Sequence, residues 1–292
     1  MILGNIDLVA IQLVQSFSGP ALDIIFRLIS FFGNPAFWII VGTVLYWIGK
    51  EKQGISILNL VLIVTAVVGA LKFFFAVPRP EGFRKVYENV LPGAFSPGIV
   101  TNISFPSGHT TTAAACSAYV LRKKRGFLTA LLIALPFAVA LSRIYLGMHF
   151  LSDVLAGLLL GCILGLINRR MRKIFDKYEF RLSKINDEII FIGISLLAAA
   201  IILFLETPLI AIVVLGIYAG HYASKELNFE QEKLHGKRAL VKVLLGMVTV
   251  TVLLLTTILL PFLTGIIAFI TGIWISLGYP LIYSRLILKE YI

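Results

Sequence analysis

Long apolar stretches alternate with short polar segments along most of this 292-residue chain. A helix that crosses a bilayer needs about 20 mostly apolar residues. Nine such helices are predicted, at residues 35–49, 53–76, 107–121, 126–145, 149–168, 187–205, 208–223, 241–261 and 263–284. The predicted fold is therefore an all-α, polytopic membrane bundle whose two termini lie on opposite sides of the membrane.

The N-terminal region departs from this pattern, because its apolar sequence is broken into two pieces that are too short to span a bilayer. The break consists of Ser18, Gly19 and Pro20. In the second piece, one helical stripe carries Asp23, Arg27 and Ser30. Residues 1–34 are predicted to form helices that lie in the outer membrane interface. A frayed first spanning helix is the alternative.

Composition supports the membrane assignment, and charge orients the chain. With 59% hydrophobic residues and a mean hydropathy of +0.95, the chain has more apolar surface than one soluble core can hide. A net charge of +11 would suit a nucleic-acid partner, but none is expected because the basic residues form short clusters between apolar spans. Of the 26 Lys and Arg residues, 20 fall in alternate loops on one side. That side is predicted to be cytoplasmic, with the N-terminus outside and the C-terminus inside.

The stretch KFFFAVPRP places two cations near the outer end of the second predicted span. A lysine as deep as Lys72 is costly unless it pairs or lines a wet cavity, and Pro78 and Pro80 stop the helix. Lys72 and Arg79 can point the same way. Snorkelling of both side chains at a helix end is the alternative.

The stretch FPSGHTTTAAA predicts an anion site at the start of the third span. Pro106 and Ser107 open a helix whose first N–H groups are free. Gly108 allows a ligand to approach the backbone closely, and His109 lies beside it. A capped helix start without a ligand is the alternative.

The stretch SRIYLGMHFLSD, residues 142–153, carries the third cluster. Asp153 follows His149 by four residues, so on a helix the carboxylate lies within reach of the imidazole. Holding one ring nitrogen leaves the other free as a nucleophile or base, and Arg143 supplies positive charge for an anion. An ordinary interfacial histidine is the alternative.

All three clusters are predicted on the outer side, which independent structural roles would not explain. The long outer loop 81–105 mixes charged and apolar residues. It either caps the site or packs on the helix ends.

These three motifs, in this order, resemble the signature motifs of the type 2 phosphatidic acid phosphatases. That superfamily also includes the glucose-6-phosphatases and the vanadium haloperoxidases. The resemblance covers residues 35–168. One departure is Leu151, where many members have proline, and it affects no reacting group.

The resemblance implies a role for each site residue. His149 would attack phosphorus and form a phosphohistidine, with Asp153 holding its tautomer. His109 would protonate the leaving oxygen and then activate water. The phosphoryl group would be bound by Lys72, Arg79, Ser107, Gly108 and Arg143. No metal and no cofactor are implied, because fixed cations do the work of magnesium, and vanadate is expected to inhibit.

Residues 35–184 are predicted to form a phosphatase core of five transmembrane helices, and residues 185–292 an extension of four. The extension is a scaffold, a surface for homodimer formation or a second wall of the substrate groove, and the sequence leaves these open. Small core positions are expected for Cys116 and Cys162. Solvated positions on the cytoplasmic side are expected for His221 and His235.

Three classes of function fit these motifs. A lipid phosphatase needs an outward site at bilayer depth, which the helix-end motifs suit; phosphatidate, phosphatidylglycerophosphate and prenyl phosphates or diphosphates all qualify as substrates. A sugar-phosphate phosphatase fits the predicted topology, but glucose-6-phosphatases lack the carboxylate found here as Asp153. A transporter or scaffold with a degenerate site is disfavoured because every catalytic residue is present, and the haloperoxidases are soluble. The sequence predicts an integral phosphatase of the cell membrane, with a lipid phosphate as its substrate and its active site on the extracytoplasmic side.

Overall fold

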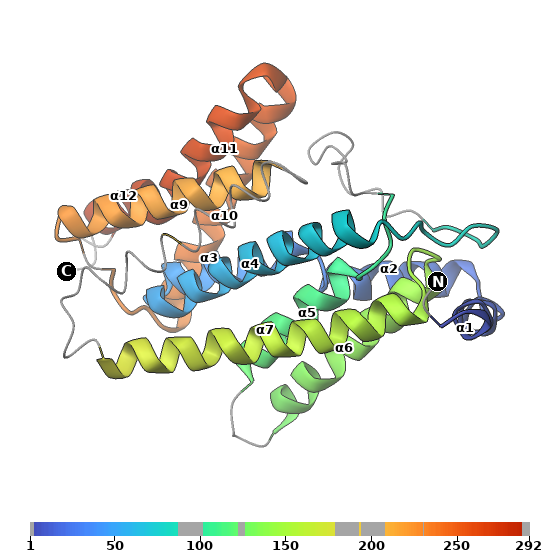
Figure 1. Ribbon diagram of the computed structural model, residues 1–292. Helices are drawn as coiled ribbons and strands as arrows, with labels where there is room; N and C mark the ends of the chain where they lie inside the picture. Colours follow the sequence, from blue (N-terminus) through green and yellow to red (C-terminus); the bar gives the residue numbers. More distant parts are fainter. Residues whose placement is uncertain are drawn as a thin grey trace.

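The computed structural model describes residues 3–86, 102–121, 126–178, 193, 208–229 and 231–287. All regular structure in these ranges is helical (Figure 1), which confirms the predicted class for this part of the chain. The helices are α1 (Asn5–Gln15), α2 (Pro20–Phe31), α3 (Pro35–Trp47), α4 (Glu51–Phe75), α5 (Gly108–Val120), α6 (Phe127–Tyr145), α7 (Leu151–Tyr178), α9 (Pro208–Glu226), α10 (Gly236–Leu259), α11 (Thr264–Ile273) and α12 (Tyr279–Ile282).

The described helices support fewer membrane spans than the sequence predicts. Five segments are long and apolar enough to cross a bilayer, namely α4, α6, α7, α10 and Pro261–Arg285, and α2 with α3 would make a sixth as one span bent by 50°. With 13 residues each, α3 and α5 are about 20 Å long and do not cross a hydrocarbon core of about 30 Å alone. Nine spans are therefore not confirmed. The predicted span 187–205 lies outside the described residues, apart from residue 193.

Close contact between α5 and α7 builds the centre of the bundle. Along the face of α7 that meets α5, every fourth residue is a glycine. A Cβ on Gly157 would lie 2.9 Å from the Ser107 carbonyl oxygen, and Cβ atoms on Gly161 and Gly165 would collide with carbonyl oxygens of α5. Small residues thus let two backbones approach. This approach brings the start of α5 beside the start of α7, where Ser107 N donates to the Asp153 carbonyl at 3.1 Å.

The C-terminal helices pack on α3 and α4 rather than standing apart. One hydrophobic cluster combines Tyr46, Trp47 and Leu62 with residues of α9 and of the last helices. Trp47 Nε1 donates to the Ile275 carbonyl at 2.8 Å, and Tyr46 donates to that of Ser276 at 3.0 Å. The C-terminal helices therefore support two helices of the predicted core. The division at residues 34 and 184 stays a prediction.

Two side chains differ from their predicted environments. Cys162 is exposed, while Cys116 is buried as expected, because Gly161 faces α5 and the next residue on a helix points about 100° away. His221 is partly buried rather than solvated, and its Nδ1 lies 3.0 Å from the Tyr46 hydroxyl. The fold places α9 against α3, which the sequence could not indicate. His235 is exposed as predicted.

The N-terminal helices lie at the end of the bundle where α4 ends and α7 begins (Figure 1). Two short helices, α1 and α2, lie on either side of the break, and α2 begins at Pro20. Their place in the membrane interface stays a prediction. Ser30, on the predicted polar stripe of α2, is fully buried, while Arg27 is exposed. At this end of the bundle all three sequence motifs meet.

Candidate active site

Four helix ends meet around His149. α4 ends at Phe75 after Lys72, α5 begins at Gly108, α6 ends at Tyr145 after Arg143, and α7 begins at Leu151. In addition to burial, the charges of Arg79, Arg143 and Lys72 all lower the pKa of the His149 imidazole, and His109 at the start of α5 acts in the same direction. The structure thus brings together the three motifs that the sequence placed on one side.

A turn, rather than a helix, carries His149. The expected helix from residue 149 begins two residues later, so His149 precedes it. Gly147 turns the chain with φ +68°, and a Cβ there would collide with the Arg84 carbonyl oxygen. Met148 N donates to the Arg143 carbonyl at 3.1 Å and closes the turn. His149 and Asp153 therefore do not share one face of a helix, as the four-residue spacing predicted. The turn and the first turn of α7 bring them together instead.

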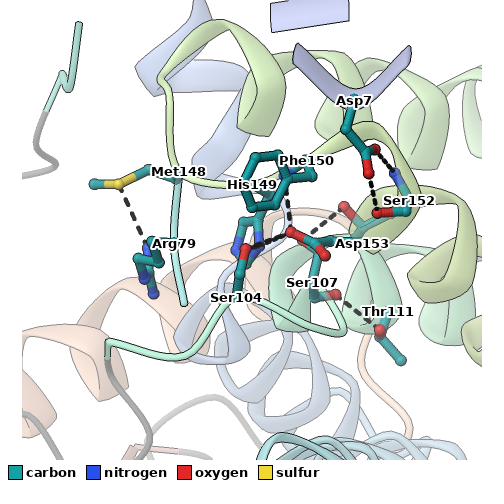
Figure 2. Close-up of polar contacts among 11 residues, drawn as sticks. Asp7, Arg79, Ser104, Ser107, Thr111, Met148, His149, Phe150, Ser152 and Asp153 are labelled. Carbon is teal, nitrogen blue, oxygen red and sulfur yellow. Dashed lines mark hydrogen bonds and ion pairs between the residues drawn. The ribbon is translucent and has the colours of Figure 1, made fainter. Parts of the chain in front are cut away.

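His149 and Asp153 are both buried, with 2% and 0% of their surface exposed, and Nδ1 of the ring lies 3.4 Å from Asp153 Oδ2. Ser104 lies against both (Figure 2). Its hydroxyl donates to Asp153 Oδ2, and its oxygen lies 3.3 Å from His149 Nδ1. Phe150 N also donates to Asp153 Oδ2, at 2.8 Å. Three groups therefore contact the carboxylate, all of them at Oδ2.

This arrangement assigns the tautomer of His149. An ionised carboxylate only accepts hydrogen bonds, and a serine has one proton to donate. Because Ser104 donates that proton to Asp153, its oxygen presents lone pairs to the ring, and Nδ1 is the nitrogen that carries hydrogen. Nε2 is then left with the lone pair that a nucleophile needs.

The surroundings of His149 also favour its neutral form. Burial holds the pKa of His149 well below its usual value, and the positive charges of Arg79, Arg143 and Lys72 act in the same direction. Each charge makes a second cation on the ring costly. The imidazole is therefore neutral at pH 7.

The three cations differ in how they are held. Lys72 and Arg143 are 7% and 3% exposed, and the burial of Lys72 argues against a snorkelling side chain. Arg79 lies beyond the end of α4, and its Nη1 donates to Met148 Sδ at 3.4 Å, a weak acceptor. Arg143 Nη1 donates to the Ser30 hydroxyl at 2.6 Å.

The start of α5 offers backbone N–H groups near the same place (Figure 2). Ser107 N is occupied by the Asp153 carbonyl, so the groups that remain for an anion begin at Gly108. A Cβ on Gly108 would meet only Val68 Cγ1, at 3.6 Å. A methyl group at Gly108 would therefore be in ordinary van der Waals contact with Val68, and glycine itself places no side chain in front of its N–H group.

Residues 53–176 match the family described as the PAP2 superfamily, and all three motifs fall inside this segment. The segment belongs to the PAP2 superfamily. PAP2 is the family that the three motifs resemble.

Three curated relatives of the chain are named as phosphatases of lipids. The chain is 31% identical to phosphatidylglycerophosphatase B of Bacillus subtilis (43% of this chain, 61% of the relative). It is 32% identical to undecaprenyl-diphosphatase of Sulfolobus acidocaldarius (46% and 62%). It is 28% identical to a dihydrosphingosine 1-phosphate phosphatase of Schizosaccharomyces pombe (56% and 41%). The chain thus spans less than two thirds of each of these relatives.

Sequence reasoning did not single out two residues that hold the site, Ser104 and Asp7. Asp7, in α1, is fully buried and accepts from Ser152 N at 2.8 Å, beside Asp153. A lone acidic residue in an apolar stretch was the available signal for Asp7. Ser104 lies three residues before Ser107, and nothing in its spacing indicates its partners.

No metal site is found in the described part of the chain. Among the described residues, no group of three or more His, Cys, Asp and Glu side chains could hold a metal ion. Independence from metal stays a prediction for enzymatic assay.

Proposed function

We propose that this protein is an integral membrane phosphatase that hydrolyses the phosphomonoester or diphosphate of a lipid at the extracytoplasmic face. One observation carries the proposal: the neutral, oriented imidazole of His149 lies among three cations and beside the start of α5. Membership of the PAP2 superfamily and the names of the curated relatives support it.

In the first step, Nε2 of His149 attacks phosphorus. A nitrogen–phosphorus bond forms, and the bond from phosphorus to the lipid oxygen breaks. His109 gives its proton to that oxygen, so the lipid leaves as an alcohol, or as a monophosphate when the substrate is a diphosphate. Asp153 accepts a hydrogen bond from the Nδ1–H of the phosphohistidine and so stabilises the positive charge on the ring.

In the second step, His109 acts as a base. It takes a proton from water, the water oxygen attacks phosphorus, and the nitrogen–phosphorus bond breaks to release phosphate. Charge on the phosphoryl oxygens in both transition states is stabilised by fixed donors. These are Lys72, Arg79, Arg143, the Ser107 hydroxyl and the N–H of Gly108.

The helix-end position of the site supports a lipid substrate. A phosphate bound there leaves an acyl or prenyl tail in the hydrocarbon, where each buried CH₂ contributes about 0.8 kcal/mol. A sugar phosphate gains nothing from that burial and needs polar partners for its hydroxyl groups. Tail length should therefore control specificity.

The test is kcat/KM of the purified protein in mixed micelles at fixed surface concentration. The substrates are matched phosphates and diphosphates with short and long tails, together with glucose 6-phosphate. We expect long-tailed lipids to be preferred, activity to persist in a metal chelator, and vanadate to inhibit. Equal turnover of glucose 6-phosphate would replace the lipid by a sugar phosphate, and activity that is lost in chelator and restored by magnesium would contradict the metal-free mechanism. His149→Ala serves as the inactive control.

A further inference from the structure

The N-terminal helices contact the catalytic motifs at three separate points, although they precede the PAP2 segment. Asp7 of α1 caps the start of α7 through Ser152, and Ser30 of α2 bonds Arg143. At Gly33, between α2 and α3, a Cβ would lie 2.8 Å from the carbonyl oxygen of His109. Two of these contacts reach the motif at residues 142–153, and the third reaches His109 in the motif at the start of α5.

The contact between Ser30 and Arg143 is the most direct of the three. Ser30 is fully buried and Arg143 is 3% exposed. Nη1 donates to the Ser30 oxygen at 2.6 Å, a short hydrogen bond from a charged donor. A guanidinium is planar with five fixed N–H groups, so fixing one of them fixes the direction of the others.

Ser30 lies in the last turn of α2, which ends at Phe31. The carbonyl ends of a helix carry partial negative charge that favours a cation. The end of α2 is therefore a suitable place for a buried guanidinium, and the hydroxyl of Ser30 selects one orientation of it.

Other residues of the N-terminal segment are linked to the C-terminal end of α6, close to Arg143. Arg84 forms a two-point ion pair with Asp23, which also accepts from the Tyr145 hydroxyl at 2.8 Å. Gln15 Nε2 donates to the Arg84 carbonyl at 2.7 Å and to the Tyr145 carbonyl at 3.0 Å. Since Tyr145 is two residues after Arg143, these contacts hold α2 in register with the guanidinium.

We propose that Ser30 is a positioning residue of the active site, which fixes the guanidinium of Arg143 toward the phosphoryl group and makes α2 a part of that site. This role rests on the proposed function of Arg143 as a phosphate ligand. With this role for Ser30, the N-terminal segment takes part in catalysis although it lies outside the three PAP2 motifs.

The test measures orthovanadate binding to the purified full chain by calorimetry, alongside kcat and KM. We expect Ser30→Ala to weaken vanadate binding and lower kcat/KM on the order of ten-fold. Ser30→Thr, which keeps the hydroxyl, should remain near wild type. The matched control is Ser16→Ala, because the Ser16 hydroxyl bonds its own helix at Leu13. A purely structural role would reduce the active fraction but leave the vanadate affinity unchanged.

A double-mutant cycle with Arg143→Lys separates the pair from general damage. If Ser30 acts through Arg143, Ser30→Ala should have little further effect when Arg143 is already lysine. Full additivity, or unchanged vanadate affinity in Ser30→Ala, would overturn the proposal. Should Ser30→Ala not fold, Ser30→Cys takes its place in the same cycle. Because vanadate binding needs no turnover, this result is independent of whether a lipid phosphate proves to be the substrate.

Discussion

At the scale of single residues, one hydroxyl group decides which nitrogen of His149 carries the proton. Ser104 donates to Asp153 and presents its oxygen to Nδ1. The carboxylate and the serine thus act as a unit on the ring. Loss of either should leave His149 present but wrongly oriented or protonated.

A series of substitutions tests this unit. His149→Ala should abolish turnover, and Asp153→Asn should lower kcat by about 10²–10⁴ while leaving measurable activity, since the ring remains. Ser104→Ala should lower kcat on the order of ten-fold. The control is Ser117→Ala, a buried serine of α5 whose hydroxyl has no hydrogen-bond partner among the described residues. Near-normal activity of His149→Ala would refute its assignment as the nucleophile.

The depressed pKa of His149 predicts the pH dependence of the reaction. An ordinary histidine protonates near pH 6.5, and protonation removes the nucleophilic lone pair. Because the pKa of His149 is lowered, the acidic limb of kcat/KM should lie below that pH. Arg79→Gln removes a neighbouring positive charge, so the pKa should rise and the acidic limb should move to higher pH.

Ionisation of the substrate affects the profiles of wild type and Arg79→Gln equally. A difference between the two profiles therefore reports on the enzyme. Rate profiles in detergent from about pH 4.5 to about pH 8.5, two units on either side of the usual histidine pKa, provide the measurement. A limb that stays in place in the variant would show that Arg79 does not act on the nucleophile.

At the scale of elements, the packing of α5 on α7 holds the catalytic histidines together. α5 carries His109 at its start, and α7 begins two residues after His149. The glycines of α7 allow the two backbones to touch below the site. Any side chain placed in this contact must push the helices apart.

Gly161→Val tests this contact. The added side chain meets the Thr111 carbonyl oxygen, and overpacking of this kind typically costs about 1–3 kcal/mol. We expect a lower unfolding temperature in detergent and a loss of kcat. Cys162→Val is the matched control on the exposed face of the same helix, and it should behave as wild type. Equal stability of both variants would argue against the close packing.

At the scale of the whole molecule, the site and two basic residues counted on the predicted cytoplasmic side, Arg169 and Lys242, lie toward opposite ends of the helices. Lys242 Nζ is 3.2 Å from Gln231 Oε1, next to Glu51 at the start of α4. Arg169 donates to the carbonyl of Leu121, just past the end of α5. The catalytic residues occupy the other ends of α4 and α5. This separation supports an extracytoplasmic site if the basic loops are cytoplasmic.

Single cysteines can test that orientation in a background lacking Cys116 and Cys162. Glu81 and Glu226 are both exposed and lie near the two opposite ends. An impermeant thiol reagent applied to intact cells should label Glu81→Cys and spare Glu226→Cys. Labelling at position 226 alone would invert the topology and move the site to the cytoplasm.

The sequence by itself determined the helical class, the three motifs and their common side, because hydrophobic length and residue spacing are local properties of a chain. Tertiary structure decided the rest. α3 and α5 proved too short for separate spans, His149 lies on a turn, and His221 packs against Tyr46. Ser104, Asp7 and Ser30 found partners that are 49, 145 and 113 residues away. Sequence periodicity carries no information about such pairs, since only the packing of helix ends brings them within hydrogen-bond distance.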